Sequence, residues 1–145
     1  MNKRIASIAL LACILPSLAT ELSGMQSGSS PISTTVCDLV RNPAKYSGER
    51  VRFHANVSSD GFEYSSLFDP NCDTVGLSFG FFSEDWDKDA KLKKFDKALE
   101  QMSRAKQPTI SATFTGRFTY SPNNTNVTKR RMFEITEVDD LHLKR

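Results

Sequence analysis

Residues 110–120, ISATFTGRFTY, alternate apolar and polar side chains along their whole length. The alternate set consists of Ile110, Ala112, Phe114, Gly116, Phe118 and Tyr120. Serine, threonine and arginine fill the positions between them. Successive side chains of a β-strand point to opposite faces of a sheet, so this period of two predicts a strand with one face in a hydrophobic core.

The same period occurs upstream of this stretch. Residues 51–58, VRFHANVS, predict a second half-buried strand, and Asp60-Gly61 after it is typical of a hairpin turn. Apolar residues at every second position of residues 75–81 predict a further strand. The turn-forming run Asp69-Pro70-Asn71 separates that strand from the one that follows the hairpin.

Two other predicted strands each contain a residue that breaks the alternation. The apolar face of residues 62–68 is formed by Phe62, Tyr64 and Phe68. Leu67 is out of phase with that face, and we predict a β-bulge there. The apolar face of residues 132–143 is formed by Phe133, Ile135, Leu141 and Leu143. Val138 is out of phase with it.

Two segments have the period of a helix. After N-cap candidates at residues 33–35, the apolar spacing of residues 36–40 predicts a short helix that carries Cys37 and ends at Asn42-Pro43. Ser83-Glu84-Asp85 opens a longer predicted helix that ends at Gln107-Pro108. Its apolar stripe is formed by Leu92, Phe95, Leu99 and Met102.

The order of these elements predicts the fold. One helical stripe cannot cover a flat five-stranded sheet, but a sheet that closes into a barrel buries its own apolar face and needs the helix only at one end. The predicted fold class is mainly β with one α-helix, a five-stranded OB-fold barrel in the order β-β-β-α-β-β. A short N-terminal capping helix precedes it. We assign residues 33–145 to this single domain.

The N-terminus predicts export. Residues 1–19 have a basic head, an apolar run of about 11 residues and small residues before a cut after Ala19, whereas a helix that spans a bilayer needs about 20 apolar residues. We therefore predict a signal peptide, no transmembrane segment and a periplasmic or secreted protein. The alternative is a lipoprotein anchored at Cys13. Residues 20–32 are rich in serine and glycine and predict a flexible tether.

Composition narrows the class of protein. The chain of 145 residues is 39% hydrophobic and 25% charged, which excludes a disordered or collagen-like chain. Removal of residues 1–19 leaves equal numbers of basic and acidic residues, so no broad nucleic-acid footprint remains. Cys37 and Cys72 then remain, and we predict that they form a disulfide. Free thiols, or a redox or metal site, are the alternatives.

A motif near the first strand resembles a known family. Its residues are Leu39, Asn42, Pro43, Tyr46, Gly48, Val51 and Val57. They resemble the opening of small exported OB-fold proteins, similar to the tRNA anti-like OB-fold group. The resemblance implies that Tyr46 packs over the barrel end and that Gly48 permits a tight turn. It carries over no catalytic residue, and the name of the group implies nucleic-acid binding.

Six residues are candidates for ligand binding. Arg52 and His54 lie on the polar face of residues 51–58, and OB-folds bind ligands with early strands and with the loop between the last two strands. That loop ends in the basic cluster Lys129, Arg130 and Arg131, and Tyr120 precedes it. Aromatic and cationic side chains together clamp nucleic acids or anionic glycans. The alternative is a solvated strand face and a solubilising cluster.

We expect no catalytic set, no cofactor and no metal. Asp85, Asp87 and Asp89 resemble half of a calcium loop, but Ala90 stands where that loop needs glycine. The leading hypothesis is an exported, non-enzymatic binding module whose ligand is an oligosaccharide, a protein or, with weaker support, a nucleic acid. The alternatives are an oligomeric toxin-like or interaction subunit and a nuclease-type hydrolase. The sequence leaves the oligomeric state open.

Overall fold

A computed structural model describes residues 30–59, 65–72, 76–81, 86–104 and 109–144. The elements, in chain order, are β1 (Ile32–Ser33), α1 (Val36–Arg41), α2 (Pro43–Tyr46), β2 (Arg50–Ser59), β3 (Ser65–Phe68), β4 (Leu77–Phe81), η1 (Trp86–Lys88), α3 (Ala90–Arg104), β5 (Thr109–Tyr120), η2 (Val127–Arg130) and β6 (Arg131–Lys144). The predicted signal peptide and residues 20–29 of the predicted tether lie outside the described residues. So do Phe62, Tyr64, Val75 and Ser83-Glu84-Asp85.

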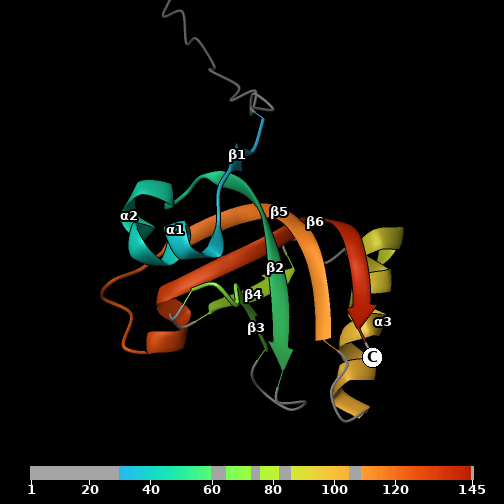
Figure 1. The fold of residues 1–145 in the computed structure, drawn as a ribbon. Coiled ribbons are helices and arrows are strands. Elements are labelled where there is room, and N and C mark those ends of the chain that lie inside the picture. The colour runs from blue at the N-terminus through green and yellow to red at the C-terminus, as the bar shows by residue number, and fades with distance from the viewer. Residues whose placement is uncertain (1–29, 60–64, 73–75, 82–85, 105–108, 145) are drawn as a thin grey trace, which may run out of the picture.

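The sheet closes into a five-stranded barrel with one extra strand. Its strand order is β1-β2-β3-β4-β6-β5, and β5 pairs with β2 to complete the ring. The pairing of β4 with β6 is parallel, and the other four pairings of the ring are antiparallel. The predicted barrel is therefore confirmed. In Figure 1, α1 and α2 lie on one side of the barrel and α3 lies on the opposite side.

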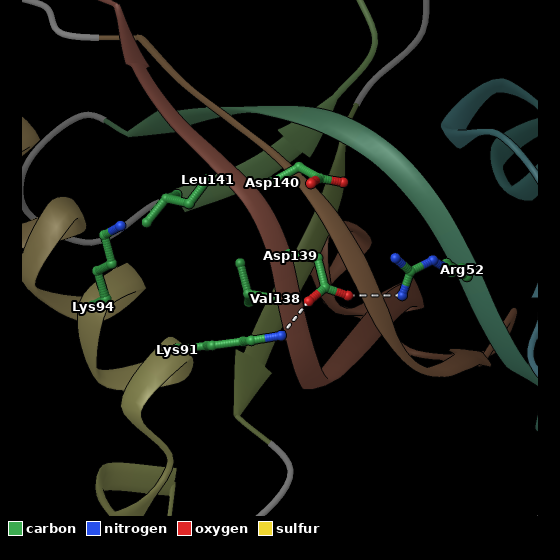
Figure 2. A pocket seen from close by; sticks show the side chains of 7 residues that line it. All are labelled: Arg52, Lys91, Lys94, Val138, Asp139, Asp140 and Leu141. Carbon is green, nitrogen blue, oxygen red and sulfur yellow. Dashed lines mark hydrogen bonds and ion pairs between the residues drawn. The ribbon is translucent and has the colours of Figure 1, made fainter.

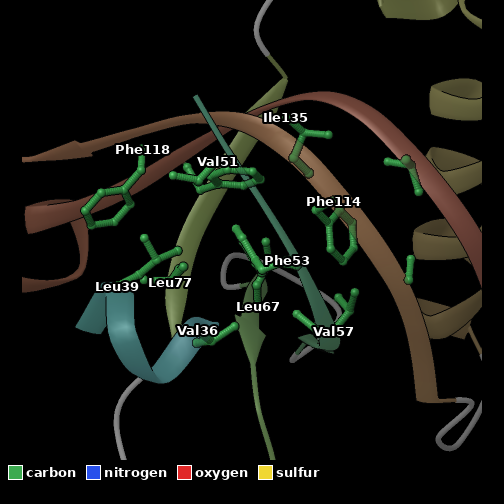
Figure 3. Close-up of a cluster of buried hydrophobic side chains, with 14 of the residues drawn as sticks. Val36, Leu39, Val51, Phe53, Val57, Leu67, Leu77, Phe114, Phe118 and Ile135 are labelled. Atoms are coloured by element: carbon green, nitrogen blue, oxygen red, sulfur yellow. The ribbon is translucent and has the colours of Figure 1, made fainter. Parts of the chain in front are cut away.

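The inner faces of the strands form the core (Figure 3). The alternation predicted for β2 and β5 is confirmed, because Val51, Phe53, Ala55 and Val57 are all buried and so is the matching face of β5. The ring of Phe53 meets the ring of Phe133 edge-on, with centroids 4.8 Å apart. Aromatic rings of this size bury the largest apolar areas of any side chain.

The predicted apolar stripe of α3 closes one side of the barrel. Phe95 is fully buried, and its ring centroid lies 5.3 Å from that of Phe114 on β5. Leu92 is buried as well, while Leu99 and Met102 pack against the core with part of their surface exposed. Asp89 caps the helix, because its Oδ1 accepts hydrogen bonds from the N–H groups of the first turn.

The first helical segment follows local rules. Thr35 is the N-cap of α1, and its Oγ1 accepts a hydrogen bond from the N–H of Asp38 at 3.1 Å. Pro43 begins α2, a position where the missing N–H costs no helical hydrogen bond. Tyr46 is buried, and Gly48 has a φ of 88° and donates its N–H to the carbonyl of Phe118 at 2.7 Å.

The structure corrects three details of the predicted strands. Ile32, assigned to the tether, belongs to β1, a two-residue strand whose length is too short for a periodic signal. Leu67, predicted to be out of phase, is fully buried opposite Val57, so the core face of β3 is set by Leu67 and not by Phe68. The bulge predicted at Leu67 is wrong, because β3 pairs with β2 and β4 there without a register shift. Leu143, predicted to face the core, is 45% exposed.

Two bulges interrupt β6 between Phe133 and Leu143. One register shift lies between Thr115 and Gly116 of β5, and the other lies between Ser111 and Thr113. The first bulge reverses the alternation, which explains why Val138 is buried although it is out of phase with Phe133. The second bulge restores it, so Leu143 pairs with the buried Ile110, and Leu143 is exposed because it lies near the end of β6. No helix within the described residues is long and apolar enough to cross a bilayer.

Candidate functional site

A groove lies between α3, β2 and β6, and we call it the α3 groove (Figure 2). It is lined by Arg52, Lys91, Lys94, Val138, Asp139, Asp140 and Leu141. Its volume is about 400 Å³, within the range of small-molecule sites. Three segments that are far apart in the sequence thus supply three cations and two carboxylates to one place.

Asp139 joins two of these cations. Its Oδ1 accepts a hydrogen bond from Nζ of Lys91 at 2.6 Å, and its Oδ2 accepts one from Nη1 of Arg52 at 2.9 Å. The hydrogen bond from Lys91 and then that from Arg52 lower the pKa of Asp139. The same contact with Asp139 raises the pKa of Lys91. Asp139 and Lys91 therefore both stay charged at neutral pH.

The cations keep donors for a ligand. Arg52 makes both of its side-chain hydrogen bonds through Nη1, to Asp139 and, at 3.0 Å, to Oγ1 of Thr115. A guanidinium has five N–H donors, so Nη2 and Nε have no partner within the described residues. Lys91 uses one of its three donors, and Lys94 makes no ion pair in the described part of the chain. The groove is therefore organised around Asp139 but not saturated.

The main chain is strained at the edge of this groove. Asp140 and Leu141 of β6 stand opposite the single residue Ala112 of β5, and Asp140 has a φ of 51°. This left-handed conformation is uncommon for a residue with a Cβ. The carboxylate of Asp140 accepts a hydrogen bond from Oγ1 of Thr113 at 3.3 Å. Such strain concentrates at functional sites, and here it bends β6 beside the three cations.

A second groove borders the other edge of β2, and we call it the Thr34 groove. It is lined by Thr34, Thr35, His54, Ala55, Asn56, Asp69, Pro70 and Asn71. Its volume is about 390 Å³. Its side chains come from the residues between β1 and α1, from β2 and from the turn that follows β3. It differs from the α3 groove in having a single carboxylate and no lysine or arginine among the described residues that line it.

The structure divides the six predicted binding residues between different places. Arg52 lines the α3 groove, and His54 lines the Thr34 groove. Tyr120 pairs with Arg131 where β5 ends, whereas Arg52 pairs with Thr115 in the middle of β5. The two positions on β5 are about five residues apart, which corresponds to roughly 17 Å along a strand. The six residues therefore do not form one site.

The basic cluster after the last loop is partly used by the protein itself. Lys129 is exposed in η2. Arg130 is half-buried and donates from Nε to the carbonyl of Asn124 at 2.9 Å, so it holds the loop. Nε of Arg131 is buried and has no hydrogen-bond partner among the described residues. Tyr120 packs against the core with part of its ring exposed.

Cys37 and Cys72 lie beside each other, although about 35 residues separate them. No bond joins the two sulfur atoms, so the predicted disulfide is not formed in this structure. A hydrogen bond with the Cys72 thiol, together with desolvation, raises the pKa of Cys37 to about 11. Cys37 is therefore protonated at neutral pH, and because the thiolate is the attacking form, oxidation that begins at Cys37 would be slow.

Sequence analysis did not identify four residues of the α3 groove. Lys91 and Lys94 look like ordinary residues on the exposed face of a helix. Asp139 and Asp140 carried a signal, because two consecutive aspartates are uncommon inside a strand and the neighbouring Val138 was out of phase. Together these features indicate a bulge with polar residues, but they do not indicate which segment faces it.

Comparison of the chain with known protein families, curated proteins and solved structures finds no match. Within the described residues, no three histidine, cysteine, aspartate or glutamate side chains are placed to hold a metal ion. Asp89, one of the three aspartates compared with a calcium loop, caps α3 through its Oδ1. The chemistry of the two grooves therefore carries the functional argument.

Proposed function

We propose that the protein is an exported, non-enzymatic binding module built on an OB-fold barrel, and that its α3 groove binds an anionic oligosaccharide. The observation that carries this proposal is the convergence of Arg52, Lys91 and Lys94 on one groove that contains only two carboxylates. The surplus of positive charge favours a ligand that brings a negative group.

The arrangement of the strands supports the OB-fold part of the proposal. β2, β3 and β4 are neighbours in this order, β6 lies between β4 and β5, and β5 returns to β2. An OB-fold is a five-stranded Greek-key barrel. In this chain α3 connects β4 to β5, which are the third and fourth barrel strands in sequence order. Proteins with that fold bind oligonucleotides and oligosaccharides.

The state of Asp139 supports binding rather than catalysis. A general base is most effective when its pKa lies near the operating pH. Lys91 and Arg52 instead hold the pKa of Asp139 below its ordinary value. His54, the histidine that the sequence places on the binding face, lines the other groove. The groups of the α3 groove are thus suited to hold a fixed charge.

The distribution of basic residues favours an oligosaccharide over a nucleic acid. A groove that follows a nucleic-acid backbone needs continuous positive charge. Arg52 on β2 pairs with the middle of β5, whereas the exposed Lys129 lies in η2 beyond the end of β5, and Arg50 is ion-paired with Glu137. Arg52, Lys91 and Lys94 instead lie together in one groove of about 400 Å³, which suits a compact ligand.

Export is supported by residues 1–19, which lie outside the described residues, and by the adjacent Cys37 and Cys72. A thiol–disulfide oxidoreductase would oxidise the two thiols to a disulfide, and its own disulfide would take up the two electrons and two protons. We therefore place the mature protein, from Thr20 onward, in the periplasm or outside the cell. N-terminal sequencing of exported protein tests the cut after Ala19, and a lipid on Cys13 would contradict it.

Titration of the purified protein with a sulfated disaccharide and with its desulfated form tests the ligand class. We expect saturable binding of the sulfated form and weaker binding of the desulfated form. Lys94→Gln should lower the affinity for the sulfated form by roughly threefold to tenfold, because it removes a charged donor. Lys97→Gln, an equal change of charge on α3 outside the groove, should leave the affinity unchanged. Equal binding of both sugars, or equal losses in both variants, would contradict the proposal.

A further inference from the structure

The Thr34 groove opens where one edge of β2 has no neighbouring strand. β1 pairs with β2 at Val51 and Arg52, and β3 pairs with it from Asn56 onward. Residues 53–55 between these positions pair with β5 on the opposite edge alone. The barrel wall is therefore interrupted, and side chains rather than backbone surround the gap.

The groups around this gap are polar and almost uncharged. They are hydroxyls, carboxamides, one imidazole and one carboxylate. The carboxylate is partly used, because Oδ1 of Asp69 accepts hydrogen bonds from the main-chain N–H and from Nδ2 of Asn71, at 2.9 Å and 3.0 Å. A set of this kind can both donate to and accept from a ligand that carries hydroxyl groups.

Three of these polar side chains lack partners in the described part of the chain. Oγ1 of Thr34 is buried and makes no hydrogen bond. The main chain fixes its position, because Thr34 donates its N–H to the carbonyl of Arg52 at 3.0 Å. His54 and Asn56, two residues apart on β2, make no side-chain hydrogen bond with a described residue. Buried polar groups are normally satisfied, so the Thr34 hydroxyl lacks a complement, while the exposed His54 and the half-buried Asn56 are open to a ligand.

The shape of the gap favours a compact ligand over a peptide strand. A peptide that extends a sheet needs an open edge. Here Thr34 and Thr35 close one end of the gap and Asp69–Asn71 close the other. The three residues between them span about 10 Å of strand. Pro70 adds an apolar surface to the polar rim, which suits a ligand with one C–H face.

We propose that the Thr34 groove binds a neutral saccharide, whose hydroxyl groups form hydrogen bonds with Thr34, His54 and Asn56. This inference goes beyond the proposed function, because it concerns the other edge of β2 and requires no charge on the ligand. The two proposals are independent, and either groove can bind its ligand without the other.

NMR titration of the full chain with cellobiose and with maltose tests the inference. We expect saturable shifts of the main-chain amides of His54, Asn56 and Asn71 with at least one of these neutral sugars. The amides of Lys91 and Lys94 should not move, which separates this site from the α3 groove. Absence of saturable shifts with both sugars would overturn the inference and would leave the proposed anion site untouched.

A pair of matched variants identifies the contact. Thr34→Val replaces the unsatisfied hydroxyl by a methyl group and should lower the sugar affinity roughly threefold to tenfold. Thr119→Val makes the same change at an exposed position of β5 and should leave the affinity unchanged. If Thr34→Val fails to fold, Asn56→Ala supplies the same comparison. If Thr34→Val, or Asn56→Ala in its place, binds the sugar as tightly as the unmodified protein does, the assignment of these side chains as ligand contacts is overturned.

Discussion

The two edges of β2 are built differently. On one edge, β2 pairs with β5 at every position from Arg50 to Val57, and β5 in turn pairs with β6 along its length. On the other edge, β1 contributes two paired positions and β3 contributes four, with a gap between them. We call these the continuous wall and the interrupted wall. The first wall pairs β2 continuously, whereas the second leaves residues 53–55 without a neighbouring strand on that edge, and the Thr34 groove lies there.

The comparison also separates stability from binding within the continuous wall. Its inner face carries the buried aromatic side chains Phe53, Phe114 and Phe133. Its outer face carries Arg52 and Asp139, which line the α3 groove. The inner face of the continuous wall therefore stabilises the fold, and its outer face positions the charged side chains of the α3 groove. The following four changes test this division, from the largest expected effect to the smallest.

Phe114→Ala should remove about 4 kcal/mol from the free energy of unfolding, because it empties a fully buried site beside Phe95. Phe68→Ala changes a half-buried phenylalanine on β3 of the interrupted wall and should cost about 1 kcal/mol. Urea denaturation measures both values. Equal losses of unfolding free energy in the two variants would mean that the two walls contribute alike to stability, which would contradict this difference between them.

Oxidation of Cys37 and Cys72 should add about 4 kcal/mol to the free energy of unfolding, since the bond would close a loop of about 35 residues. It would tie α1 to the end of β3, on the interrupted wall. Denaturation with and without a reductant, after treatment with oxidised glutathione, measures the difference. A Cys37→Ser, Cys72→Ser double variant should not respond to the reductant. If the unmodified protein does not respond either, the bond does not form.

Gly116→Ala should cost about 2 kcal/mol through overpacking. A Cβ on Gly116 would lie 2.1 Å from the carbonyl oxygen of Glu134, so β5 or β6 of the continuous wall would have to move. Gly80→Ala on β4 is the control, because a Cβ there meets nothing within 4 Å. Thermal unfolding of the two variants checks this expectation. Similar losses at both glycines would argue against the close contact of β5 and β6.

Asp139→Asn should have the smallest effect on stability, and that effect should depend on pH. The folded pKa of Asp139 is lowered, so its ion pairs stabilise the fold above the ordinary aspartate pKa of about 4. This contribution disappears as the pH falls through the lower, folded value. The raised pKa of Lys91 adds stability below its unfolded value of about 10.4, and this is lost as the pH rises through the folded value.

The difference between the unmodified protein and Asp139→Asn should therefore be constant near neutral pH, shrink below pH 4 and decrease with added salt. Denaturation midpoints across this range measure it. Asp87→Asn, a change at an exposed residue of η1, should show no such dependence. A difference that persists unchanged at low pH would mean that the carboxylate charge of Asp139 does not act through these pairs.

The parts of the fold that the sequence predicted share one property. The alternation in residues 51–58 and 110–120, the stripe through Phe95 and the turn at Gly48 are all local patterns, and all of them are confirmed. Leu67 was assigned to the wrong face, and Leu143 is exposed near the end of β6, because the face and the burial of a strand residue depend on its register with neighbouring strands. β1 had no signal at all, since two residues cannot show a period.

The candidate sites were predicted less well than the fold. Arg52 and His54 were identified from the outward face of β2, and each of them lines a groove. The cluster at Lys129 was grouped with them, although the structure places it at the far end of β5. Lys94 was not identified, because nothing in a helical sequence indicates which strand its exposed face meets.

The amino-acid order alone determined which residues turn inward in the longest strands and along the stripe of α3, because that choice depends on side-chain period and hydrophobicity within a few neighbouring residues. Only the tertiary structure decided where the grooves lie. The α3 groove requires β2, α3 and a bulged β6 to meet, and the Thr34 groove requires β1 and β3 to leave a gap along β2. Such juxtapositions depend on the register between distant strands, which the closing of the barrel sets.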